Sequence, residues 1–295
     1  MWQIVHLAQL NHMKSLISIS FGLLVAVVMT GCNNTGNTDS AATSTTETGG
    51  APAPASLQYT VTKVYPHDTL SYTQGLLVFE GQLMESTGGS PEYNPYHSWV
   101  GKVDLATGKV SQKVPLDSVY FGEGITILNG KLYQLTWKGR KGFVYDAKTL
   151  KRIQEFPLKT EGWGITNDST NLIVSDGSSN LYFLNPTDFS TRRIVSVTDN
   201  NGPVNNINEL EFIHGFIYAN KYQSDYILKI DPANGQVAGI ANLSGLLSNH
   251  TKENTRQQKY TDGEAVLNGI AFDAGTGKIY VTGKLWPNLF EISFQ

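Results

Sequence analysis

Glu123 is a carboxylic acid placed between two glycines, in the segment Phe121-Gly122-Glu123-Gly124-Ile125-Thr126. Glycine lets the backbone turn sharply and leaves little side chain beside the acid, which suits a group that must meet a small reactant. A glutamate in a glycine-rich turn is also commonly an ordinary solvated residue. The choice between these interpretations depends on what surrounds Glu123, and therefore on the repeats of the chain.

The register of this segment occurs five times, and each copy is an apolar strand, a tight turn and a second strand. The copies begin at Gln74, Glu123, Trp163, Asn208 and Asn268. A second hairpin follows each copy, so one repeat holds four strands, at a spacing of about 40 to 60 residues. This pattern predicts an all-β protein, a five-bladed β-propeller. An open β-sandwich is the alternative.

The fifth repeat lacks a fourth strand, because the chain ends at Gln295. The alternating segment from Tyr59 to Val64 precedes the first repeat and has no partner of its own. We expect it to complete the last blade and to close the ring, since pairing the two ends removes exposed strand edges.

The first strand of each propeller blade lies beside the central axis, so we expect the first residues of the five copies to form one ring. The residues that follow each second strand should lie nearby. They include Trp137, Asp176, Tyr222 and Lys284. Together these side chains predict a pocket with an aromatic wall and several amide groups. The aromatic residues would serve equally well as packing between blades.

Glu123 is the member of the ring that titrates. Partial dehydration beside Trp163 would raise the pKa of its carboxyl group, as proton transfer near neutral pH requires. Lys284 could stabilise a developing negative charge or pair with Glu123. Glu209, one position from the ring in the fourth copy, is the competing acid.

Composition excludes several other functions. Charged residues are 16% of the chain and the net charge is −3, so we expect no nucleic-acid surface. A single cysteine excludes an intrachain disulfide, and the six histidines show no spacing typical of a zinc site. No Gly-X-Ser-X-Gly segment is present. Oxygen ligands for a structural calcium ion could come from Asp176-Gly177-Ser178 or Thr261-Asp262-Gly263-Glu264, although such runs are commonly turns.

The N-terminal part of the chain is typical of an exported lipoprotein. Lys14 precedes an apolar run from Leu16 to Val28, and Met29-Thr30-Gly31-Cys32 resembles a bacterial lipobox. We expect a signal peptide over residues 1–31, starting at Met1 or Met13, and lipid on Cys32. An uncleaved anchor helix is the alternative. Residues 32–56 predict a flexible membrane-anchored linker, and residues 57–295 the propeller. The expected location is the periplasmic side of a membrane or the cell surface.

Two connections are long for a compact domain. One runs from Thr198 to Ile207, and the other from Leu243 to Leu267. Long connections are often functional, so they are expected either to border the site or to be solvated excursions. A helical turn is expected in the second.

Six ordered motifs resemble the plant and bacterial type of glutaminyl-peptide cyclotransferase. They are Tyr72-Thr73-Gln74-Gly75-Leu76, Phe121-Gly122-Glu123-Gly124, Gly162-Trp163-Gly164-Ile165, Ile207-Asn208-Glu209-Leu210-Glu211, Val266-Leu267-Asn268-Gly269-Ile270-Ala271 and Thr282-Gly283-Lys284-Leu285-Trp286-Pro287. The resemblance spans about Tyr59 to Ile292. It implies a five-bladed propeller that cyclises the N-terminal glutamine of peptides or proteins to pyroglutamate and releases ammonia. It also implies an enzyme that does not use zinc. We expect a monomer that requires no cofactor.

The resemblance implies that Glu123 is the general acid and base. It assigns the substrate pocket to Gln74, Trp163, Asn208 and Lys284, to which the repeat register adds Trp137, Tyr222 and Asn268. The chain departs from the family where Tyr222 stands in place of a common tryptophan, and where the segment from Gly89 to Ser98 is longer. Two alternatives remain at this stage: a non-catalytic periplasmic propeller that binds peptides or small metabolites, and a lactonase-like propeller with an axial calcium ion.

Overall fold

The computed structural model describes residues 52–89, 91, 96–251 and 264–295. These residues belong to one compact unit. The predicted signal peptide, Cys32, most of the predicted linker and residues 261–263 lie outside the described residues. No helix among the residues that the structure describes is both long enough and apolar enough to cross a membrane.

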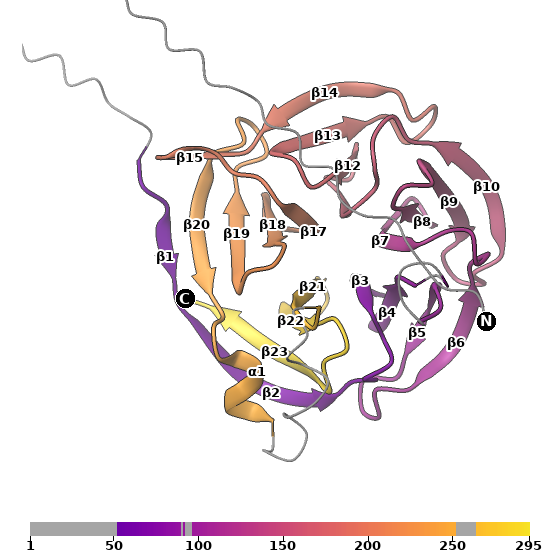
Figure 1. Cartoon of the computed structure of the whole chain (residues 1–295), viewed down its shortest axis with the longest axis horizontal. Coiled ribbons are helices and arrows are strands. Elements are labelled where there is room, and N and C mark those ends of the chain that lie inside the picture. The colour runs from indigo at the N-terminus through magenta and orange to yellow at the C-terminus, as the bar shows by residue number, and fades with distance from the viewer. Residues whose placement is uncertain (1–51, 90, 92–95, 252–263) are drawn as a thin grey trace, which may run out of the picture. The chain divides into compact units, whose positions relative to one another are not determined.

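Five antiparallel blades of four strands each surround a central axis (Figure 1), which confirms the prediction of a five-bladed β-propeller. Blade 1 is β3 (Thr73–Phe79), β4 (Gln82–Thr87), β5 (Trp99–Val103) and β6 (Val110–Pro115). Blade 2 is β7 (Gly122–Leu128), β8 (Lys131–Thr136), β9 (Lys141–Asp146) and β10 (Arg152–Pro157). Blade 3 is β11 (Ile165–Asn167), β12 (Leu172–Ser175), β13 (Asn180–Leu184) and β14 (Thr191–Ser196). Blade 4 is β17 (Ile207–Ile213), β18 (Phe216–Lys221), β19 (Tyr226–Ile230) and β20 (Val237–Asn242).

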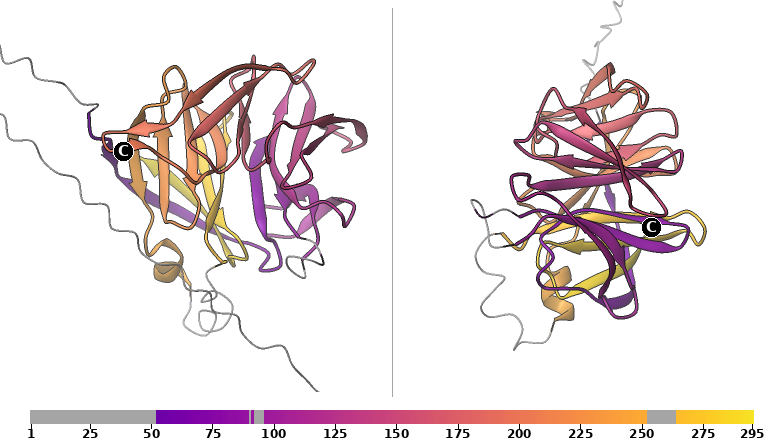
Figure 2. Two further views of the ribbon diagram at one scale, coloured as in Figure 1. Left: turned by 45° about the horizontal axis from the view of Figure 1, so that its top comes forward. Right: turned by 90° about the vertical axis from the view of Figure 1, so that its right-hand side faces the viewer.

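Blade 5 combines the two ends of the described chain. It consists of β21 (Leu267–Asp273), β22 (Lys278–Gly283), β23 (Asn288–Phe294) and, outermost, β2 (Tyr59–Pro66). β2 is antiparallel to β23, with Tyr59 opposite Phe294, and both views in Figure 2 show these strands side by side. The segment at Tyr59 therefore supplies the fourth strand of the last repeat.

β1 (Ala55–Leu57) lies parallel to β20 at the outer edge of blade 4, with Ala55 opposite Gly239. Regular structure thus begins two residues before the boundary expected at Leu57, because the backbone of Ala55 and Ser56 pairs with an otherwise open strand edge.

The hydrophobic core is divided among the five contacts between neighbouring blades, and one cluster fills each contact. Between blades 1 and 2, for example, Leu77 and Met84 pack against Ile125 and Leu132. Inner strands such as β3 are buried on both faces, whereas the outer strand β10 is mostly exposed. Each fully buried aliphatic or aromatic side chain stabilises the fold by roughly 1.5–3 kcal/mol.

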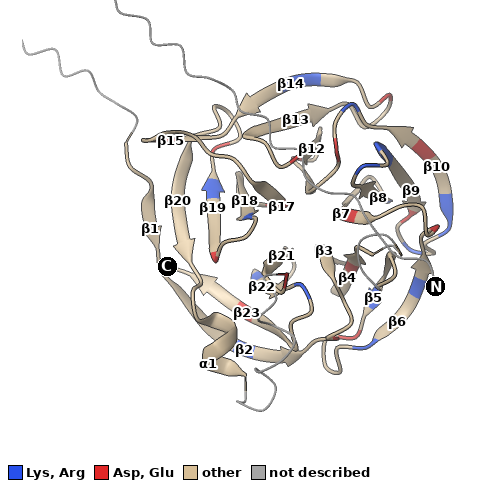
Figure 3. Ribbon diagram, viewed as in Figure 1, with Lys and Arg blue, Asp and Glu red and all other residues tan. Residues whose placement is uncertain are grey.

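Charged residues lie on both outer and inner strands. Figure 3 shows Lys and Arg on the outer strands β6, β10 and β14, and an acidic residue on the inner strand β7. The acid on β7 is Glu123, which is 5% exposed. An ionisable group this deep in a sheet protein requires partners or a function.

The long connections contain short elements. The connection after blade 3 holds a small hairpin of β15 (Thr198–Asp199) and β16 (Gly202–Pro203). The connection after blade 4 begins with α1 (Leu246–His250), the helical turn expected there.

Candidate active site

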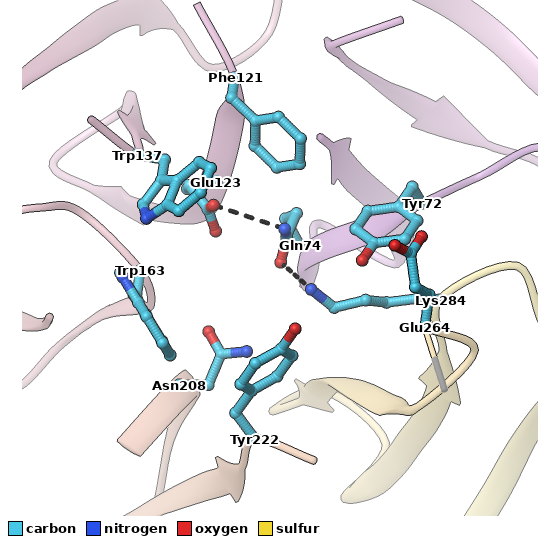
Figure 4. A pocket seen from close by; sticks show the side chains of 10 residues that line it. All are labelled: Tyr72, Gln74, Phe121, Glu123, Trp137, Trp163, Asn208, Tyr222, Glu264 and Lys284. Atoms are coloured by element: carbon cyan, nitrogen blue, oxygen red, sulfur yellow. Dashed lines mark hydrogen bonds between the residues drawn. The ribbon is translucent and has the colours of Figure 1, made fainter. Parts of the chain in front are cut away.

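A cavity of about 230 Å³ lies at the axis, where the inner strands of all five blades begin. Figure 4 shows the side chains that line it: Tyr72, Gln74, Phe121, Glu123, Trp137, Trp163, Asn208, Tyr222, Glu264 and Lys284. Seven of the nine residues expected in the pocket are among them. Asn268 and Asp176 are the exceptions.

β-Bulges place the ring residues in this cavity. In blades 1, 2, 4 and 5 the pairing of the inner strand with the next strand shifts register at the ring residue, for example between Gly122 and Ile125 around Glu123. A bulge re-aims a side chain that a regular strand would place on one face of the sheet. In blade 3, β11 begins only at Ile165, and Trp163 is held by its amide, which donates to the Ser175 carbonyl at 3.0 Å.

Glycines bring the inner strands into close contact just below the ring. A Cβ atom on Gly124 would lie 2.8 Å from the Trp163 carbonyl oxygen and 2.8 Å from the Ile165 nitrogen. The Gly124 amide donates to the same Trp163 oxygen at 2.9 Å. Backbone packing therefore requires a glycine at position 124. The same packing fixes the position of the neighbouring Glu123 in the pocket.

Three polar side chains form a chain across the pocket (Figure 4). The Lys284 ammonium donates to Gln74 Oε1 at 2.8 Å, and Gln74 Nε2 donates to Glu123 Oε1 at 3.4 Å. Lys284 Nζ also lies 4.6 Å from the ring centre of Tyr72 and 5.1 Å from that of Tyr222. Cation–π contacts of this kind hold an ammonium group without consuming its remaining donors.

Burial shifts the pKa of both ionisable groups in this hydrogen-bonded chain, Glu123 and Lys284. It raises the pKa of the Glu123 carboxyl well above its ordinary value; the charge of Lys284 opposes this rise and that of Glu161 adds to it. Burial lowers the pKa of Lys284 to about 8, against the opposing effect of Glu123. Each shift makes the neutral form of its group more accessible, as proton exchange with a substrate requires.

Asn268 lies behind the pocket and does not line it. Its side chain is fully buried, its Nδ2 donates to the Thr73 carbonyl at 2.9 Å, and its Oδ1 accepts from Asn208 Nδ2 at 3.0 Å. The register places Asn268 in the ring, but its carboxamide is directed to the backbone of blade 1.

Two other residues considered from the sequence lie outside the pocket. Asp176 accepts hydrogen bonds from the Ser178 hydroxyl at 2.5 Å and the Tyr182 hydroxyl at 2.9 Å, as an acid in a structural turn does. Glu209 stands where the other four copies have glycine. Its carboxylate accepts from the amides of Leu76 at 3.3 Å and Ile270 at 2.8 Å, so it links three blades below the pocket.

Four residues at the site were not assigned from the sequence: Tyr72, Phe121, Glu161 and Glu264. The first three each stand two positions before a ring residue, in the same register of three repeats. Alternate residues of a strand face the same side, so this register was the available signal. Glu264 comes from the long connection after α1 and carries no such signal.

Among the described residues, no three His, Cys, Asp or Glu side chains lie close enough together to hold a metal ion. Asp176 of the first calcium candidate is occupied by the turn contacts given above, and most of the second candidate lies outside the described residues.

Comparisons with known proteins identify the family of this chain. A family model described as glutamine cyclotransferase matches residues 28–294. A glutaminyl-peptide cyclotransferase of Arabidopsis thaliana is 40% identical over 233 residues, which are 78% of this chain and 69% of that protein. The crystal structure of Myxococcus xanthus glutaminyl cyclase is 34% identical with a TM-score of 0.73, and the match covers 82% of this chain and 98% of that one. The chain belongs to the glutamine cyclotransferase family.

Proposed function

We propose that this protein is a glutaminyl-peptide cyclotransferase, which converts the N-terminal glutamine of peptides or proteins to pyroglutamate and releases ammonia. The observation that carries the proposal is the buried acid Glu123 beside Gln74 and Lys284, in the pocket of a chain that is 40% identical to a glutaminyl-peptide cyclotransferase. The family and the pocket favour this enzyme over a propeller that only binds.

The reaction is intramolecular. The α-amino nitrogen of the glutamine attacks its own side-chain carbonyl carbon, and a C–N bond forms that closes a five-membered ring. The bond to the side-chain nitrogen then breaks. One proton moves from the attacking amine to the leaving nitrogen, which departs as ammonia, so no other reactant is consumed.

Glu123 is the group that moves this proton. In its carboxylate form it accepts a proton from the attacking amine, and in its acid form it returns the proton to the leaving nitrogen. Because burial raises the pKa of Glu123 well above its ordinary value, its acid form is more accessible than that of a solvated glutamate. A positioned acid and base of this kind is worth roughly 10²–10⁴-fold in rate.

Lys284 and Gln74 supply the donors for the oxygen that becomes negative in the tetrahedral intermediate. One Lys284 N–H is used by Gln74 Oε1, and the ammonium has others. A donor aimed at a developing oxyanion in a dry site is worth about 10²–10³-fold.

The aromatic wall holds the reacting residue in a folded conformation. Trp163 meets Tyr222 edge to face at 5.5 Å between ring centres, and Phe121 meets Trp137 in the same way at 5.7 Å. Because nucleophile and electrophile belong to one glutamine, restricting its rotations brings the reacting atoms together before any proton moves.

The test is to incubate the purified protein with a Gln-initiated dipeptide and to follow both ammonia and the pyroglutamyl product. An N-acetylated form of the peptide, which lacks the nucleophile, is the substrate control. Glu123→Gln should abolish turnover while its unfolding temperature and peptide affinity stay near those of the wild type. Glu155→Gln removes an exposed carboxylate of β10 and should turn over normally. A folded wild-type protein that binds the peptide without releasing ammonia would refute the proposed enzyme.

We also propose that turnover requires no cofactor and that the enzyme acts as a monomer. Activity should survive dialysis against a chelator and should not change with protein concentration. A structural calcium ion would appear as a lower unfolding temperature after chelation, at unchanged turnover.

We further propose that the enzyme is exported and anchored by lipid on Cys32, as residues 1–56 suggest. Cys32→Ser should move the protein from the membrane fraction to the soluble fraction and should prevent incorporation of labelled fatty acid. Membrane retention of this variant would favour an uncleaved anchor helix.

A further inference from the structure

The carboxamides at the floor of the pocket have orientations that their neighbours dictate. A carboxamide donates through nitrogen and accepts through oxygen, so a partner that can only accept, or only donate, decides which end faces it. The Thr73 carbonyl can only accept, and the Lys284 ammonium can only donate.

The Thr73 carbonyl fixes the orientation of the Asn268 carboxamide, which in turn fixes that of Asn208. Asn268 must turn its Nδ2 toward the Thr73 carbonyl, at 2.9 Å, so its Oδ1 faces Asn208. Asn208 Nδ2 donates to this Asn268 oxygen at 3.0 Å, so the Oδ1 of Asn208 must point away from Asn268. Asn208 is 2% exposed, and its Oδ1 has no hydrogen-bond partner among the described residues. Figure 4 shows this oxygen directed into the pocket.

The Lys284 ammonium fixes the orientation of the Gln74 carboxamide, and here the oxygen, not the nitrogen, faces the partner. Gln74 must turn its Oε1 toward Lys284, at 2.8 Å, which leaves Nε2 facing Glu123. The pocket thus offers donors, Lys284 Nζ and Gln74 Nε2, and separately a buried acceptor, Asn208 Oδ1. A primary carboxamide has the complementary pattern, because it carries an accepting oxygen and a donating nitrogen on one carbon.

We propose that Asn208 Oδ1 accepts an N–H of the substrate's side-chain carboxamide, and that Asn268 is the positioning residue that turns this oxygen toward the substrate. The inference rests on the proposed function. It makes Asn208 a determinant of specificity for glutamine over glutamate, because the γ-carboxylate of a glutamate would place an oxygen against the Asn208 oxygen. A site built to receive an N–H rejects a group that cannot supply it.

The test compares a Gln-initiated dipeptide with the same dipeptide carrying glutamate γ-methyl ester. Both have the same amine and carbonyl carbon and give the same pyroglutamyl product, but the leaving oxygen of the ester has no hydrogen to donate. The measured quantity is the ratio of kcat/KM for glutamine to kcat/KM for the ester, after subtraction of the rate without enzyme.

Asn208→Leu and Asn268→Leu should each lower this ratio by roughly 10- to 100-fold, the range for one buried hydrogen bond left unmade, with a smaller fall for the ester. Asn167→Leu is the matched control. The Asn167 side chain also bonds to a neighbouring blade, to Thr126 Oγ1 at 2.8 Å and the Ile127 carbonyl at 3.0 Å, but it does not line the pocket. It should lower stability and leave the ratio unchanged.

An equal fall for both substrates in Asn208→Leu would overturn the assignment of the Asn208 oxygen. An unchanged ratio in a folded Asn268→Leu protein would overturn the positioning role, and Asn268→Ala serves if the leucine variant does not fold. Failure of the proposed function gives a different result, since the wild type would then turn over neither substrate.

Discussion

Glu161 does not line the pocket, but its carboxylate binds two tryptophans that do. Its Oε2 accepts the indole N–H of Trp137 at 2.8 Å and that of Trp163 at 3.1 Å. Trp137 follows β8 and Trp163 precedes β11, so one carboxylate oxygen joins blades 2 and 3 beside Glu123. We expect Glu161→Ala to lower kcat/KM because both indoles lose the bond that orients them.

The size of this effect follows from the two hydrogen bonds. A hydrogen bond to a charged group contributes about 1.5–3 kcal/mol. Both indoles are only half-buried, so a released N–H can still meet water, and we count one bond rather than two. The expected loss in kcat/KM is therefore roughly 10- to 150-fold. Glu161→Gln keeps an oxygen that can accept both N–H groups, and we expect a loss of about 10-fold or less, the value of a neutral bond.

The pH profile separates the charge of Glu161 from its hydrogen bonds. The negative charge of Glu161 helps to raise the pKa of Glu123, so its removal should lower that pKa. In Glu161→Gln the acid limb of the kcat/KM profile should move to lower pH, whereas in Glu155→Gln it should stay in place. Steady-state rates of ammonia release between pH 5 and 9 give both quantities. Unchanged kcat/KM in Glu161→Ala, or a limb that moves to higher pH in Glu161→Gln, would refute this reasoning.

Three further predictions concern other parts of the site and its support. The value of kcat/KM should fall as pH rises through about 8, where Lys284 of the free enzyme loses its proton; the residual activity of Lys284→Met should show no such limb, and a retained limb would assign it to another group. Gly124→Ala should destabilise the fold by about 1–3 kcal/mol and reduce turnover, because the added methyl group meets backbone atoms of blade 3; urea unfolding measures this, and wild-type stability would count against it. Burial and the nearby Glu211 raise the pKa of Glu209, so the stability that its acid form contributes is present below the ordinary pKa and is lost as pH rises through the raised value. The Glu209→Gln side chain stays neutral at all pH values but leaves one backbone amide unpaired. Its free energy of unfolding should be lower than that of the wild type by about 1–3 kcal/mol near pH 4. A difference in unfolding free energy that does not narrow toward pH 8 would contradict the raised pKa of Glu209.

The repeat register was sufficient to predict the five blades and most of the pocket. It could do so because each ring residue, such as Gln74 or Glu123, occupies the same place at the start of an inner strand. The register could not predict where Asn268 points, because the direction of a side chain at a bulge depends on the partners it finds. Asn268 finds the Thr73 carbonyl, which belongs to another blade and is far away in sequence.

Other features depend on contacts that a single repeat does not show. Glu161 is not unusual as a residue, and its role arises only because Trp137 of the preceding repeat reaches it. Glu264 enters the pocket from a connection whose path no periodic pattern specifies. The role of Glu209 also needed the structure, since its carboxylate meets the amides of two other blades.

The pairing of β2 with β23 has a consequence for how the molecule is made. Among the five blades, β2 is the first strand to be synthesised and its partner β23 is the last. Blade 5 therefore cannot be completed until β23 has been synthesised, and its final contact spans almost the whole propeller in sequence. Contacts of such long range make folding slow. Until β2 and β23 pair, the first four blades form an incomplete ring. The unpaired edges of β2 and β23 are then open to other chains. Loss of β23 would thus leave all the pocket side chains in the chain, but the ring would lack the strand pairing that closes it.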